Sequence, residues 1–313
     1  MDNDGEPQGS KSPFPIPQTM PSVSAGDSGS EKGPESLDVL PGCDAIPLAR
    51  PVAFAHPAKP APDIHLMDES RSAAWIDIVI FLFLFISLDT VGGILIVYAH
   101  RWLSGAAAVA SADLRAERAL VVPMLAWRAA LAVLLVGVIV RHRRGNARSV
   151  GVTSGSLLLD FLIALGAAMA AGLVVVAVMS ALEICFQSLA AQLEENGRRI
   201  MDRVPKGTPV MFALVTLLVG LWEELVFRGF LMPRLRRATG SWAVAVVLST
   251  TVFAVPHLID QVAAALVPVT VLSLMFSLVT IWRRSIVPAV VAHTLFDFGM
   301  FLQLYYLAGD QWK

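Results

Sequence analysis

The fold is decided by an apolar run that begins at Pro209 and closes with LWEELVFRGFL, residues 221–231. The run is long enough to cross a bilayer, yet its second half holds Glu223, Glu224 and Arg228. At the centre of a membrane helix each such charge costs on the order of 3 kcal/mol. Three of them within six residues therefore require a structural or a functional reason.

Two of these residues are spaced to form a pair. Glu224 and Arg228 are four residues apart, so they share one helix face, and an ion pair would keep Arg228 out of contact with lipid. Glu223 lies about 100° further round the helix and is left as a spare carboxyl, which suits it to proton transfer. Two interpretations stay open here: acid–base chemistry, or a salt-bridged pair that only packs against other helices.

The composition is that of a membrane protein. Of the 313 residues, 56% are hydrophobic and only 16% are charged, which indicates a polytopic membrane protein whose surroundings are a lipid bilayer. The net charge of -1 provides no basic field for nucleic acid, so no nucleic-acid partner is expected.

The chain divides into a polar tail and a membrane region. Residues 1–72 are rich in Pro, Gly and Ser and are predicted to be a disordered tail. Apolar runs then follow, and they predict an all-α, polytopic fold with about seven transmembrane helices. The runs cover about residues 74–99, 119–140, 157–182, 209–231, 242–258, 262–282 and 286–307.

Basic residues predict the orientation, because cytoplasmic loops carry an excess of Lys and Arg. In a chain with seven spans, three arginine clusters fall on one side of the membrane, which we expect to be cytoplasmic. The N-terminus is then inside and the C-terminus outside. The clusters, which follow the second, fourth and sixth runs, are Arg141, Arg143, Arg144 and Arg148; Arg234, Arg236 and Arg237; and Arg283 and Arg284.

Polar residues also interrupt the later apolar runs. His257 closes FAVPH, residues 253–257, and His293 and Asp297 are four residues apart in PAVVAHTLFD, residues 288–297. Taken singly, His257 is explained as a histidine at the membrane interface, and His293 and Asp297 are explained as partners in a hydrogen bond within one helix. Together with Glu223, however, they put polar groups on three helices at membrane depth, where such groups face a shared interior or a water-filled cavity. A carboxylate, two imidazoles and another acidic group around one water make a hydrolytic site.

In chain order the motifs are Glu-Glu-x-x-x-Arg, Phe-x-x-x-His and His-x-x-x-Asp. This pattern resembles the CAAX protease and bacteriocin-processing family (CPBP, also called Abi). These intramembrane endoproteases are related to the type II prenyl-protein CAAX endopeptidase. The resemblance extends over about residues 150–307. It implies a CPBP-like protease core at residues 150–310, preceded by two N-terminal membrane helices at 73–149, and a peptidase acting on a membrane-associated protein or peptide, CAAX-type or bacteriocin-related.

The resemblance also implies roles for the motif residues. Glu223 would be the general base that activates water, and His257 would help to orient or polarise it. His293 and Asp297 would stabilise the oxyanion. The prenyl-protease branch has Asn at the last position, whereas Asp297 donates a hydrogen bond only when protonated. Asp297 could instead orient His293 or bind a metal.

The remaining motif residues, Glu224, Arg228 and Phe253, would support the site. Members of this family were long called metalloproteases, and a zinc ion, if present, would be held by Glu223, His257 and His293. No HExxH sequence occurs, and we prefer a metal-free glutamate mechanism without a cofactor.

Two rival functions remain at this level. One is a non-catalytic membrane scaffold or bacteriocin self-immunity factor that retains the protease fold. The other is a proton-coupled carrier, because buried Glu, His and Asp also form proton relays; the lack of repeat symmetry in the sequence speaks against it.

The predicted spans also leave a mismatch in depth. Glu223 lies eight residues, about 12 Å, from the expected helix end at Leu231, whereas His257 lies fifteen residues, about 22 Å, from the start of its run.

Overall fold

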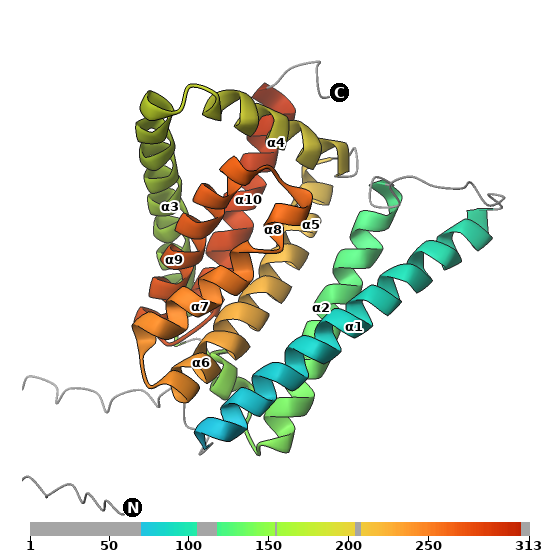
Figure 1. Cartoon of the computed structure of the whole chain (residues 1–313), viewed down its shortest axis with the longest axis vertical. Coiled ribbons are helices and arrows are strands. Elements are labelled where there is room, and N and C mark those ends of the chain that lie inside the picture. The colour runs from blue at the N-terminus through green and yellow to red at the C-terminus, as the bar shows by residue number, and fades with distance from the viewer. Residues whose placement is uncertain (1–69, 105–117, 154, 204–207, 308–313) are drawn as a thin grey trace, which may run out of the picture. The chain divides into compact units, whose positions relative to one another are not determined.

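The computed structural model describes residues 70–104, 118–153, 155–203 and 208–307. Every regular element in these ranges is helical, as predicted (Figure 1). Within them, 7 helical segments are long and apolar enough to cross a membrane, so the chain is a multi-pass integral membrane protein. The predicted tail, residues 1–72, lies almost wholly outside the described residues.

The spanning segments follow the predicted apolar runs. Three of them are composite: η2 is a π-helix that joins α5 to α6 without a break, α8 follows α7, and η3 precedes α9. A short helix, η1 (Ala147–Val150), precedes α3, and a polar helix, α4, connects α3 to α5. Apart from η1, the bounds in chain order are α1 (Arg71–Ser104), α2 (Arg118–His142), α3 (Leu157–Cys185), α4 (Leu189–Arg203), α5 (Pro209–Glu224), η2 (Leu225–Leu231), α6 (Met232–Thr239), α7 (Trp242–Ala254), α8 (His257–Asp260), η3 (Ala263–Ala265), α9 (Leu266–Arg283) and α10 (Val287–Leu307).

One predicted boundary is wrong. The helix that begins at Pro209 does not end at Leu231 but continues to Thr239. The arginines beyond Leu231 weaken the apolar signal, but Arg234 is buried: its Nε lies 3.5 Å from Asp77 of α1, and its guanidinium lies 3.8 Å from the ring centre of Phe230. An internal partner thus lets a charged residue remain within the helix.

The turn between α6 and α7 is short, and its residues are typical of a helix end followed by a helix start. Gly240 adopts a left-handed conformation with φ 78°, which glycine tolerates at a helix C-terminus. The next residue, Ser241, accepts a hydrogen bond from the backbone N–H of Val244 and so caps the N-terminus of α7. α7 therefore runs back antiparallel to α5 directly after α6 ends.

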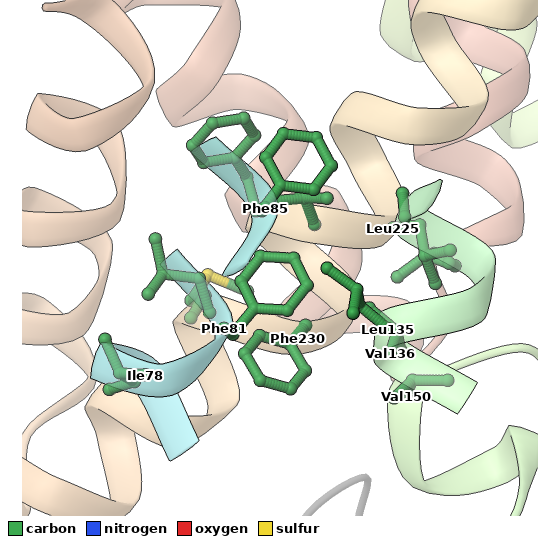
Figure 2. Packing of buried hydrophobic residues seen from close by; sticks show 14 of the residues in the cluster. Ile78, Phe81, Phe85, Leu135, Val136, Val150, Leu225 and Phe230 are labelled. Carbon is green, nitrogen blue, oxygen red and sulfur yellow. The ribbon is translucent and has the colours of Figure 1, made fainter. Parts of the chain in front are cut away.

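The largest cluster of buried apolar side chains joins α1 and α2 to the middle of this long helix. Phe81 of α1 packs on Phe230 of η2 with 4.3 Å between ring centres, and Leu135 of α2 lies beside them (Figure 2). α10 and α2 both pack against α5, and α10 also contacts α3 and α9. The helix that carries Glu223 is therefore held from several sides.

Gly229 marks a close approach of η2 to η1. A Cβ atom at this position would lie 2.9 Å from the carbonyl oxygen of Val150. We expect Gly229→Ala to lower the free energy of unfolding by about 1–2 kcal/mol, because overpacking outweighs the better helix propensity of alanine. Gly137→Ala is the matched control, since a Cβ there meets nothing within 4 Å. Denaturation in detergent micelles measures both, and equal stabilities would contradict the tight contact.

Candidate active site

The acidic pair lies at the junction of two helix types. α5 ends at Glu224, and the seven-residue π-helix η2 starts at the next residue. Glu223 and Glu224 are both buried, with 8% and 0% of their surface exposed. π-Helical segments are rare and occur frequently at functional sites, so this irregularity identifies the junction as a candidate site.

Glu224 and Arg228 form the ion pair that their spacing predicts. Arg228 Nη1 donates to Glu224 Oε1 at 2.9 Å, and Nη2 donates to the backbone carbonyl of Ser273 in α9 at 3.1 Å. The guanidinium also lies 4.7 Å from the ring centre of Phe253. Arg228 therefore connects η2 to α7 and α9 while its charge is balanced by Glu224.

His293 of α10 lies among three carboxyl groups. Its Nδ1 is 2.9 Å from Glu224 Oε1, and its Nε2 is 3.4 Å from Asp297 Oδ2 and 3.7 Å from Glu223 Oε2. Because a carboxylate only accepts hydrogen bonds, His293 Nδ1–H donates to Glu224. The opposite ring nitrogen, Nε2, therefore faces Glu223 and Asp297.

His257 is the first residue of α8, and its ring is oriented by the helix that precedes it. Its Nδ1 is 2.9 Å from the backbone carbonyl of Phe253, so Nδ1–H is the donor and Nε2 carries the lone pair. The ring centres of Phe253 and His257 are 5.0 Å apart. Phe253 thus contacts both Arg228 and His257.

The longer helix removes the mismatch in depth. Gly240 lies seventeen residues after Glu223 and seventeen before His257, and the two helices run antiparallel from the turn at Gly240. At the rise of an α-helix both residues lie about 25 Å from that turn. The expected distance of about 12 Å for Glu223 was wrong because it assumed a helix end at Leu231.

With this geometry in view, the sequence was compared with known proteins. Residues 205–299 match the family described as type II CAAX prenyl endopeptidase Rce1-like. This segment is a domain of that family. The match covers the three motifs but not residues 150–204, so the predicted core at 150–310 stays a prediction. Neither the comparison with curated proteins nor that with solved structures gave a match.

Sequence reasoning missed part of the support around the Rce1-like domain. Asn196 of the unpredicted helix α4 lies before the domain, yet its Oδ1 accepts from the N–H of Val262 at 3.2 Å and its Nδ2 donates to Gln261 Oε1 at 3.4 Å. The N–H of Gln261 in turn donates to the carbonyl of His257 at 2.8 Å. The polar character of α4 was visible in the sequence, but its partners could not be read from it.

Within the described residues, no group of three His, Cys, Asp or Glu side chains is arranged to hold an ion. Of the ligands expected for zinc, His293 has its Nδ1 engaged by Glu224, and His257 has its Nδ1 at 2.9 Å from the carbonyl oxygen of Phe253. We therefore derive no step through a metal.

The buried ion pair should dominate local stability. We expect Arg228→Met to lower the free energy of unfolding by about 3 kcal/mol, because Glu224 is left as an uncompensated buried charge. Adding Glu224→Gln should restore more than half of the loss. Arg199→Met breaks an exposed pair with Glu195 and should cost less than about 1 kcal/mol. Denaturation of these three variants and of the unchanged protein in mixed micelles tests this, and a double variant no more stable than Arg228→Met would contradict it.

Proposed function

We propose that this protein is an intramembrane endopeptidase that hydrolyses a peptide bond of a membrane-associated protein or peptide. Membership of residues 205–299 in a peptidase family supports the reaction class. The single observation that carries the proposal is the cluster in which the buried Glu223 and Glu224 and the partly buried Asp297 each lie within 4 Å of a ring nitrogen of the buried His293.

In the proposed reaction Glu223 takes a proton from a water molecule, and the resulting hydroxide attacks the carbonyl carbon of the scissile bond. His257 Nε2, which is left with a lone pair, accepts a hydrogen bond from this water and orients it. When the C–N bond breaks, the proton held by Glu223 passes to the leaving nitrogen. A new carboxyl group and an amine are formed, and Glu223 returns to its starting state.

His293 is the proposed donor to the oxyanion of the tetrahedral intermediate. Since Nδ1–H is engaged by Glu224, donation requires a second proton on Nε2. The Asp297 carboxylate, 3.4 Å from Nε2, would balance the resulting positive charge. This role suits an aspartate better than direct donation to the oxyanion, for which Asp297 would itself need a proton.

We further propose that the N-terminus is cytoplasmic and the C-terminus lies outside. The ends of α2, α6 and α9, which carry the arginine clusters, lie at the same end of the helical bundle (Figure 1). An excess of basic residues is typical of the cytoplasmic side.

The catalytic proposal is tested by Glu223→Gln, which keeps the shape of the side chain but removes the general base. We expect cleavage of a CAAX-type peptide to fall at least 100-fold, the usual contribution of a positioned base, with an unchanged amount of folded protein in the membrane. Glu194→Gln, at an exposed position of α4, is the matched control. Undiminished cleavage would exclude Glu223 as the base, and a biological function that survives the substitution would favour a scaffold or self-immunity factor.

A separate prediction concerns metals. If a glutamate-activated water is sufficient, purified protein should keep its full cleavage rate after incubation with a strong chelator and gel filtration into metal-free buffer. The rate should not rise when Zn²⁺ is added back. Loss of activity that Zn²⁺ restores would overturn the metal-free mechanism while leaving the peptidase assignment intact.

A further inference from the structure

A second polar group lies at membrane depth outside the Rce1-like domain. Arg128 is the eleventh residue of α2, and its Nε donates to Asp89 of α1 at 3.1 Å and 3.0 Å, one distance for each carboxylate oxygen. Both residues lie near the middle of their spans, where ionisable side chains are rare and usually mark a functional site.

Arg128 lies at about the same depth as Glu223. It is fourteen residues from the end of α2 at His142, and Glu223 is sixteen residues from the end of α6 at Thr239. These helix ends lie at the same end of the bundle (Figure 1). The Arg128 guanidinium is 6.0 Å from the ring centre of Trp222, the residue that directly precedes Glu223.

The pair with Asp89 leaves much of the guanidinium unused. Neither Nη1 nor Nη2 of Arg128 has a hydrogen-bond partner among the residues that the structure describes, and 42% of the side chain is exposed. Arg228, at a similar depth, has both of these nitrogens bonded. Donors left free in a membrane span need a polar acceptor, and a guanidinium matches a carboxylate with two parallel hydrogen bonds.

We propose that Arg128 binds the C-terminal carboxylate of the peptide substrate. This inference rests on the proposed peptidase function. A CAAX sequence ends its chain, so a free carboxylate lies three residues beyond the cysteine, a reach of about 10 Å in extended chain. Arg128, beside the residue that precedes Glu223, is close enough for one short peptide to engage both. Asp89 holds the guanidinium in place by its Nε, and the two Nη groups receive the carboxylate.

The competing interpretation is that the Arg128–Asp89 pair only ties α1 to α2. Binding measurements with two labelled CAAX peptides distinguish the two interpretations. One peptide has a free C-terminal carboxylate and the other has a C-terminal carboxamide. The protein is the full chain with Glu223→Gln, which prevents cleavage, in nanodiscs of phosphatidylcholine. We expect the carboxylate peptide to bind about tenfold more tightly than the amide, as for a hydrogen-bonded charged group.

Arg128→Gln should reduce the ratio of the two affinities to about one. Asp89→Asn, which weakens the pair but keeps the guanidinium, should leave a smaller preference for the carboxylate that is still above one, because the guanidinium is present but no longer held in place. An equal affinity for both peptides before Arg128 is changed, or a preference that survives Arg128→Gln, would overturn the proposal. Cleavage by the protein with Glu223 intact is measured in parallel. If the carboxylate preference depends on Arg128 but no cleavage is detected, the binding site is supported and only the proposed peptidase function is contradicted.

Discussion

The arrangement of the site depends on one oxygen atom. Glu224 Oε1 accepts from Arg228 Nη1 and from His293 Nδ1, each at 2.9 Å. Arg228 reaches on to the backbone of α9, so this carboxylate connects α5, η2, α9 and α10. Glu224 has no exposed surface, and water cannot replace either partner. The orientation of the His293 ring, and with it the direction of Nε2 toward Glu223, follows from this contact.

The fold was largely predictable because lipid imposes a simple rule on helix length and polarity. The exception was the end of the helix at Thr239, where hydropathy alone failed. Arg234 looks like the start of a loop in the sequence, but Asp77, far away in the chain, makes it a buried residue. The turn at Gly240 was marked by a glycine followed by a capping serine, a local signal that outweighs the loss of apolar character.

The individual contacts of the site were predictable only within single helices, although polar groups at membrane depth predicted that several helices face one interior. A spacing of four residues correctly indicated the Glu224–Arg228 pair and brought His293 and Asp297 together. Spacing gives no information about contacts between helices, so the Glu224–His293 bond, formed across 69 residues, was missed. The π-helix η2 was also missed, because the hydrophobic pattern of residues 225–231 was read as a continuation of the α-helix.

The depth of the site links these observations. Glu223 and His257 lie seventeen residues on either side of Gly240, so chain length places the two residues at similar depth. One added residue on either side would turn a side chain by about 100° and move it about 1.5 Å along its helix. The buried helix α6 therefore helps to set the depth of the candidate site, because it lies between Glu223 and the turn at Gly240. The ion pair of Arg234 with Asp77 does not contact Glu223, but it balances the charge of a buried residue in α6 and so helps to keep the long helix continuous.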